Sequence, residues 1–269
     1  MSQITNSGFS YTAKLDDEKT KKKFFPVCVD NFFNNPELIR NFALSLPMGS
    51  SPGGHWPGKR TKPLHEIDLE LHITLFLKVL SCYYDLKHAN VEWTQCNAFF
   101  QKIEKYDDDG QNVGWIHKDD GDELAGLIYL TPNANPNTGT SLFSVKPEAA
   151  DKHVEFTNNP EKMAFYDGNR ILKEDYLRAL NEHNDMFYET IKFQNVYNRL
   201  ITYSSDEYHR ANSFNAGDEE RLTLVFFMRG IKQGHEGMRI GRYPSTRVKD
   251  NFNFDSKFET RIRYVQANR

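Results

Sequence analysis

The stretch Trp115-Ile116-His117-Lys118-Asp119 carries the pattern on which the fold prediction depends. It is a candidate strand, and alternate side chains of a strand share one face. His117 and Asp119 would then point the same way, close enough to bind one metal ion. Ligands at this spacing are typical of sites with two histidines and one carboxylate. The pattern alone does not establish a site, because a chain with nine histidines contains one by chance.

A second H-x-D pattern begins at His183 and serves as a comparison. It lies in a segment whose apolar residues, Leu177, Leu180 and Phe187, have helical spacing. Residues two apart on a helix do not face each other. The segment therefore predicts a helix near 173–189 with a surface histidine near its end, and no metal ligand.

Further polar positions lie toward the C-terminus. His209 follows the apolar strand 199–203, and the next apolar strand, 221–229, begins with Arg221 and carries Thr223. A cation inside an apolar strand is costly unless it is paired. An arginine fork beside a hydroxyl suits a carboxylate, because it offers two parallel N–H donors and one O–H donor. The alternative is an arginine at the exposed edge of a barrel mouth.

The order of predicted elements points to an α+β, mainly β fold. A strand over 25–29 and a helix that starts at Asn35-Pro36 precede a buried helix within 67–84. From residue 91 the period changes and short strands follow. Strand candidates are 97–105, 114–119, 124–131, 140–145, 153–157, 162–166, 196–203 and 221–229. Such an order indicates helices that support one face of a sheet sandwich or barrel.

Length and charge predict one domain with two extensions. The chain has 269 residues, of which 38% are hydrophobic and 13% aromatic. We expect a flexible arm over 1–23, a single domain over 24–230 with its helical support over 24–90, and a basic extension over 231–269. The extension holds nine Lys/Arg and four Asp/Glu, and we expect it to be a solvated surface segment.

Composition excludes several classes of protein. No apolar run of 18 residues exists, so no membrane span is expected, and the N-terminus lacks the apolar core of a secretory signal. Three cysteines indicate a reducing compartment, so we expect a cytoplasmic protein. The net charge of −3 gives no global attraction to nucleic acid. Dinucleotide and P-loop motifs are absent from the sequence.

A glycine- and proline-rich loop over 48–63 carries His55, Trp56, Lys59 and Arg60. Two interpretations stay open for these side chains. They belong either to a loop that lies over the barrel mouth and contacts substrate, or to an ordinary exposed loop.

Taken together, the motifs resemble those of the Fe(II)/2-oxoglutarate-dependent dioxygenases, in particular the prolyl-4-hydroxylase-like branch, over roughly residues 95–230. The H-x-D motif, a distal histidine about 90 residues later and Arg-x-Thr on the next strand carry this resemblance. Tyr106 and Tyr129 match two tyrosines that face the co-substrate in that branch. Thr138 stands where the branch has the first glycine of a Gly-Gly hairpin.

The resemblance implies a double-stranded β-helix (jelly-roll, cupin-like) core over 91–230 with supporting N-terminal helices. It also implies two sets of site residues. These are His117, Asp119 and His209 as ligands of Fe(II), and Arg221, Thr223, Tyr129 and Tyr106 around 2-oxoglutarate. O2 is the second co-substrate, and ascorbate is the expected reductant.

The implied reaction is hydroxylation of a C–H bond with release of succinate and CO2. The substrate is expected to be a small molecule or a peptide, protein or amino-acid side chain. Asp119 favours hydroxylation, because halogenating relatives replace this carboxylate with a small residue. Two alternatives stay open: a non-catalytic cupin-like protein that binds a metal or small ligand, and a nucleic-acid demethylase of the same chemistry. The charge of −8 over the first 230 residues argues against the second.

Overall fold

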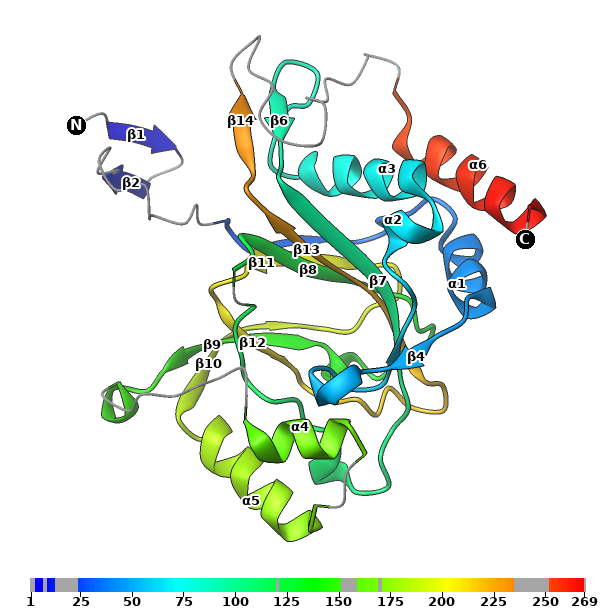
Figure 1. Cartoon of the computed structure of the whole chain (residues 1–269). Helices are drawn as coiled ribbons and strands as arrows, with labels where there is room; N and C mark the ends of the chain where they lie inside the picture. Colours follow the sequence, from blue (N-terminus) through cyan, green and yellow to red (C-terminus); the bar gives the residue numbers. More distant parts are fainter. Residues whose placement is uncertain are drawn as a thin grey trace.

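The computed structural model of the chain describes residues 3–6, 9–12, 24–119, 121–150, 159–168, 171–234 and 252–268 (Figure 1). Helices combine with antiparallel sheets, as the sequence predicts. The largest sheet has seven strands. In spatial order they are β3 (Val27–Val29), β11 (Leu200–Ser204), β8 (Leu124–Tyr129), β13 (Arg221–Arg229), β7 (Gln95–Ile103), β5 (Lys59–Arg60) and β4 (Gly49–Ser50).

A second sheet of three strands lies below the seven-stranded sheet in Figure 1. Its order is β10 (Phe187–Phe193), β9 (Thr140–Val145) and β12 (Tyr208–Ala211). Two further strand pairs are β1 (Gln3–Asn6) with β2 (Phe9–Thr12), and β14 (Lys232–Gly234) with β6 (Asn90–Glu92). The first pair lies inside the predicted arm, whose flexibility stays a prediction.

Helices cover the outer face of the seven-stranded sheet (Figure 1). They are α1 (Pro36–Ser45), α2 (Leu64–Ile67), α3 (Leu69–Leu80) and α6 (Phe254–Ala267). The predicted start of α1 is confirmed, because the Asn35 side chain accepts a hydrogen bond from Leu38 N and Pro36 is the first helical residue. Outward-facing strand residues such as Leu224, Phe226 and Ile128 are fully buried beneath this layer. None of the described helices is long and apolar enough to cross a membrane.

The helix α6 corrects the expectation that residues 231–269 form a solvated surface segment. Phe258, Ile262 and Val265 are buried in the main core, and the Phe258 ring stacks on Phe33 at 5.2 Å. Their spacing of four and three residues places them on one helix face. Within α6, charged residues such as Lys257 and Arg263 lie on the exposed faces, so a count of net charge does not reveal the apolar stripe.

Replacing Phe258 by alanine is expected to destabilise the fold by about 3–5 kcal/mol, the usual cost of truncating a buried phenylalanine. Urea unfolding followed by circular dichroism measures the change. Arg263→Ala on the exposed face of the same helix is the matched control, and it is expected to stay within about 0.5 kcal/mol of the unmodified protein. Equal small losses in both variants would show that α6 does not contribute to the core.

Two predicted strands are different in the structure. Residues 162–166 belong to the helix α4 (Pro160–Tyr166), whose start repeats the Asn-Pro signal of α1 with Asn159 as the cap. Segment 114–119 forms only a single bridge, between His117 and His209. In both places, a short apolar run does not distinguish a strand from a turn of helix or an irregular segment. The predicted strand 153–157 lies outside the described residues.

The predicted helix near 173–189 is shorter in the structure. It is α5 (Lys173–Asn184), and β10 follows it directly at Phe187. Figure 1 shows α4 and α5 beside the three-stranded sheet, on the side opposite the other helices. Five consecutive positions of β10 are exposed, between buried residues at its two ends. Its sequence therefore lacks the regular alternation of apolar and polar residues that predicts a half-buried strand.

Register decides which side chains of the large sheet face the small one. Directly opposed residues on neighbouring strands point to the same face. One row across β8, β13 and β7 consists of Leu127, Val225 and Phe99. The next row consists of Tyr129, Thr223 and Gln101, and continues to Arg60 on β5. Among the residues of these rows, the cavity that holds the candidate site is lined by Leu127, Val225, Phe99, Gln101 and Arg60.

Candidate active site

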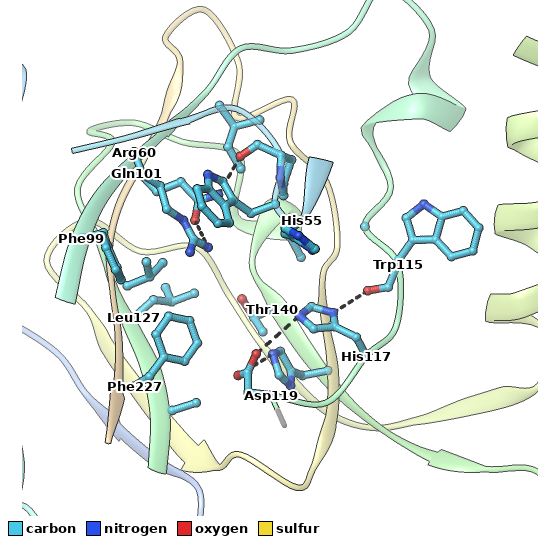
Figure 2. A pocket seen from close by; sticks show the side chains of 18 of the residues that line it. His55, Arg60, Phe99, Gln101, Trp115, His117, Asp119, Leu127, Thr140 and Phe227 are labelled. Atoms are coloured by element: carbon cyan, nitrogen blue, oxygen red, sulfur yellow. Dashed lines mark hydrogen bonds and ion pairs between the residues drawn. The ribbon is translucent and has the colours of Figure 1, made fainter. Parts of the chain in front are cut away.

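Three potential metal ligands meet between the two sheets. His117 and Asp119 come from the segment before β8, and His209 comes from β12. One ligand atom from each lies within 4.8 Å of the others. The Asp119 carboxylate is 3.3 Å from His209 Nε2 and 3.8 Å from His117 Nε2 (Figure 2). The structure therefore brings together the three residues that the sequence motifs identify as candidate ligands.

A backbone bridge, rather than a regular strand, sets this arrangement. His117 N donates to His209 O at 3.0 Å, and His209 N donates to His117 O at 2.9 Å. Asp119 N donates to Ser205 O, which fixes the end of the segment. The two imidazole rings consequently lie 4.4 Å apart between centroids.

Hydrogen bonds select the tautomer of both histidines. Nδ1 of His117 lies 2.9 Å from the carbonyl oxygen of Trp115, and Nδ1 of His209 lies 2.9 Å from that of Glu207. A carbonyl only accepts, so each Nδ1 carries a proton, and in the neutral form of each ring Nε2 is the nitrogen with a free lone pair. Burial, followed by the charge of His209, holds the pKa of His117 well below its usual value. Two imidazole nitrogens and one carboxylate are a donor set that fits a divalent iron ion.

The helix α5 supports the backbone of the segment that carries His117 and Asp119. Asn184 accepts from Ile116 N at 3.0 Å and donates to Gly114 O at 3.0 Å. Nε2 of His183 lies 2.6 Å from the Ile116 carbonyl oxygen. The prediction of a surface histidine is therefore wrong: His183 is only 6% exposed, because α5 packs against this segment. It lies outside the cluster of potential ligands that His117, Asp119 and His209 form among the described residues.

Replacing Asn184 by alanine is expected to weaken Mn(II) or Fe(II) binding by about 10–100-fold, the usual effect of removing a group that orients metal ligands. The two bonds to the backbone at 114 and 116 would be lost, and His117 would no longer be held in place. Titration of Mn(II) followed by electron paramagnetic resonance measures the affinity. Asn181→Ala, at an exposed position of the same helix, should leave it unchanged. Equal affinities in both variants would contradict the positioning role.

A cationic fork lies in the same cavity as the three ligands. Arg221 lines the cavity and is only 3% exposed, and Thr223, two residues further on the same strand face, is fully buried. Nε and Nη2 of Arg221 and the Thr223 hydroxyl have no hydrogen-bond partner in the described part of the chain. Burial lowers the pKa of Arg221. The alternative of an exposed arginine at a barrel edge is thereby corrected, and the unpaired donors fit the carboxylate of a ligand.

The two predicted tyrosines lie behind the cavity wall. Tyr129 is fully buried, its hydroxyl donates to Thr140 Oγ1 at 2.9 Å, and the Arg221 guanidinium lies 5.6 Å from its ring centre. Tyr106 packs against Phe165 with ring centres 4.9 Å apart. Among the described residues that line the cavity, neither tyrosine is included. Their contact with a co-substrate stays a prediction.

The cavity has a volume of about 550 Å³ and includes side chains that sequence reasoning left undecided or missed. His55, Trp56 and Arg60 from the glycine-rich loop line it, which favours the substrate-contact interpretation of this loop. Lys59 instead pairs with Glu104 at 3.2 Å. Lys162 of α4 also lines the cavity. It was missed because its segment resembles a strand, although the Asn-Pro helix start at 159–160 is a usable signal.

The chain is similar to one protein family and to several solved structures. A model of a family of unknown function, DUF6445, matches residues 14–227. No curated protein matches the chain significantly.

Several solved structures are similar to most of this chain. HygX from Streptomyces hygroscopicus with nickel and 2-oxoglutarate bound is 12% identical, with a TM-score of 0.45 and coverage of 85% of this chain and 94% of that chain. A Pseudomonas putida prolyl-4-hydroxylase is 12% identical (TM-score 0.39, 76% and 92%). The non-heme α-ketoglutarate-dependent epimerase SnoN from nogalamycin biosynthesis is also 12% identical (TM-score 0.42, 84% and 91%). Each of these structures is similar to this chain only at low identity, and the residue roles considered below rest on the geometry described above.

Proposed function

We propose that this chain, which belongs to the DUF6445 family, is an Fe(II)- and 2-oxoglutarate-dependent oxygenase that hydroxylates a C–H bond. One observation carries the proposal: the His117–Asp119–His209 cluster and the unpaired Arg221 fork line the same cavity. A 2-oxo acid needs both features, because its keto acid end binds a metal and its distant carboxylate needs a cation.

Each residue of the site has a distinct role in this proposal. His117, His209 and Asp119 hold the metal on one side, and the carboxylate cancels one of its two positive charges. Arg221 and Thr223 donate hydrogen bonds to the far carboxylate of 2-oxoglutarate and thereby orient it. When bound, the iron supplies positions for the 2-oxo acid and O2 and the oxidative chemistry that releases succinate and CO2. The apolar wall of Phe99, Leu127 and their neighbours keeps bulk water from the reaction.

The remaining parts of the sequence prediction belong to the same proposal. We propose that the two sheets belong to the predicted double-stranded β-helix, within a single domain over 24–230. Tyr129 supports the Arg221 fork through its ring. A peptide, protein or amino-acid side chain is the substrate class that the prolyl-4-hydroxylase-like motifs favour, and Asp119 as a ligand favours hydroxylation.

Binding and turnover of 2-oxoglutarate test the proposal without knowledge of the substrate. Protein supplied with Fe(II), ascorbate and O2 should bind 2-oxoglutarate and slowly release succinate in uncoupled turnover. Calorimetry under anaerobic conditions measures binding, and mass spectrometry measures succinate. Metal binding without any binding of 2-oxoglutarate would overturn the enzyme proposal in favour of a cupin-like binding protein.

A further inference from the structure

Besides Arg221, and Lys118, whose ammonium lies 4.1 Å from the Tyr208 ring centre, two cations of the cavity wall have no acidic partner in the described ranges of the chain. They are Arg60, at the end of β5, and Lys162, in the first turn of α4. Neither forms an ion pair with any described carboxylate. Because an uncompensated cation in a protein interior costs free energy, such groups are retained where a ligand supplies the missing charge.

Arg60 is held in position before any ligand arrives. Its Nη2 donates to Gln101 Oε1 at 3.2 Å, and Gln101 in turn donates to the Pro57 carbonyl at 2.7 Å (Figure 2). The guanidinium lies 4.6 Å from the ring centre of Trp56 and 5.5 Å from that of Phe99. Its buried Nε has no hydrogen-bond partner among the described residues. The fork is therefore rigid, and part of its donor capacity is unused.

Lys162 approaches the cavity from the other sheet's side. It is only 6% exposed, and its helix packs on the 3-10 turn Pro52–Gly54 of the glycine-rich loop. Burial lowers the pKa of Lys162 to about 8, although the Asp119 charge acts in the opposite direction. Burial likewise lowers the pKa of Arg60 to about 10, again opposed by Asp119. Both cations are therefore within electrostatic reach of the metal ligands and are short of negative charge.

The metal, its ligands and 2-oxoglutarate do not supply negative charge to neutralise Arg60 and Lys162. Asp119 and the two carboxylates of 2-oxoglutarate carry three negative charges, and Fe(II) with Arg221 carries three positive ones. The other acidic residue of the cavity wall, Asp122, lies 3.5 Å from Arg229. Arg60 and Lys162 thus leave the complete site with an excess of positive charge.

We propose that the oxidised substrate carries an anionic group, a carboxylate or a phosphate, that binds between Arg60 and Lys162. The inference rests on the proposed function and deepens it by naming the substrate class. The body of the substrate is apolar, because Phe99, Leu127 and Phe227 form the wall beside Arg60 and the metal ligands (Figure 2). The cavity of about 550 Å³ suits an organic acid or an amino-acid side chain with an acidic end.

Matched probes test the charge preference. The protein is loaded with Mn(II), a redox-inactive substitute for iron, and with saturating 2-oxoglutarate so that Arg221 is occupied. Calorimetry then compares 4-phenylbutanoate and 3-phenylpropyl phosphate with the neutral 4-phenylbutanamide. At least one anion is expected to bind about tenfold more tightly than the amide, since a charge-assisted hydrogen bond is worth about that much. The tighter of the two anions tells whether a carboxylate or a phosphate is preferred.

Variants locate the preference at the two cations. Arg60→Met and Lys162→Met should each lower the anion preference about tenfold, while Arg60→Lys should retain most of it. Lys59→Met is the matched control, because Lys59 neighbours Arg60 but pairs with Glu104 outside the cavity. Thermal unfolding by circular dichroism shows that each variant is folded. Lys162→Met removes an uncompensated buried charge, so no loss of stability is expected.

Three results would overturn the inference. The amide could bind as tightly as both anions, the preference could survive in both methionine variants, or only one variant could lose it, which would exclude a site built from two cations. In each case, intact binding of 2-oxoglutarate would leave the proposed function standing. Absence of 2-oxoglutarate binding would instead remove the proposed function and this inference together.

Discussion

Replacing His117 by alanine is expected to reduce 2-oxoglutarate-dependent succinate release to background. The variant keeps only Asp119 and His209, and two ligands do not hold a divalent ion at the concentrations used in assays. Metal affinity should fall further than the about 10–100-fold expected for a residue that merely orients a ligand. Succinate release by mass spectrometry and Mn(II) titration by electron paramagnetic resonance measure both effects.

A second histidine provides the control for this variant. His88 is exposed and pairs with Asp85 at 2.8 Å. His88→Ala should retain both metal binding and succinate release. Full turnover by the His117→Ala protein would contradict the assignment of His117 as a ligand. Loss of turnover with intact metal affinity would show that the ring acts in some other way.

Replacing Arg221 by methionine is expected to raise the KM for 2-oxoglutarate by about 100-fold or more. The change removes two charge-assisted hydrogen bonds, each worth about 1.5–3 kcal/mol, from the far carboxylate. Metal binding should be unaffected, because Arg221 contacts none of the three ligands in the described structure. Succinate release as a function of 2-oxoglutarate concentration, together with Mn(II) titration, separates the two effects.

Stability gives this second prediction an independent readout. Arg221 is buried, and two of its donors have no partner among the described residues, so its replacement by an apolar side chain should not lower the melting temperature of the ligand-free protein. The rise in melting temperature that 2-oxoglutarate causes should disappear. Arg178→Met, at a surface pair with Asp175, should behave like the unmodified protein. An unchanged KM in the Arg221→Met protein would refute the carboxylate-binding role.

Local signals predicted much of the site and part of the fold. The site motifs are short-range patterns, namely the H-x-D spacing, the distal His209 and the Arg221–Thr223 alternation. Each can be recognised from the residues of its own segment. The β9 and β13 bounds and the capped start of α1 were predictable for the same reason. Hydrophobic periodicity also separated His183 from the metal ligands, although it misjudged the burial of that ring.

Other features arise from contacts between distant segments. The sequence places His117 on a regular strand, whereas a single bridge to His209 and support from Asn184 position it. The apolar stripe of α6 is buried because the helix packs against α3 and α1. The local sequence of α6 does not indicate which elements it packs against. Lys162 shares a cavity with Arg60 only because α4 packs against the glycine-rich loop.

The sequence by itself determined which residue types are available for metal and carboxylate binding, because the chemistry of a side chain and the period of its segment are local properties. The tertiary structure alone decided which of them face one cavity and which charges remain uncompensated there. Register across the large sheet aligns Thr223, Gln101 and Arg60 on one face. Since burial and counter-charge depend on segments far apart in the chain, the two cations that define the proposed substrate class become visible only in the folded protein.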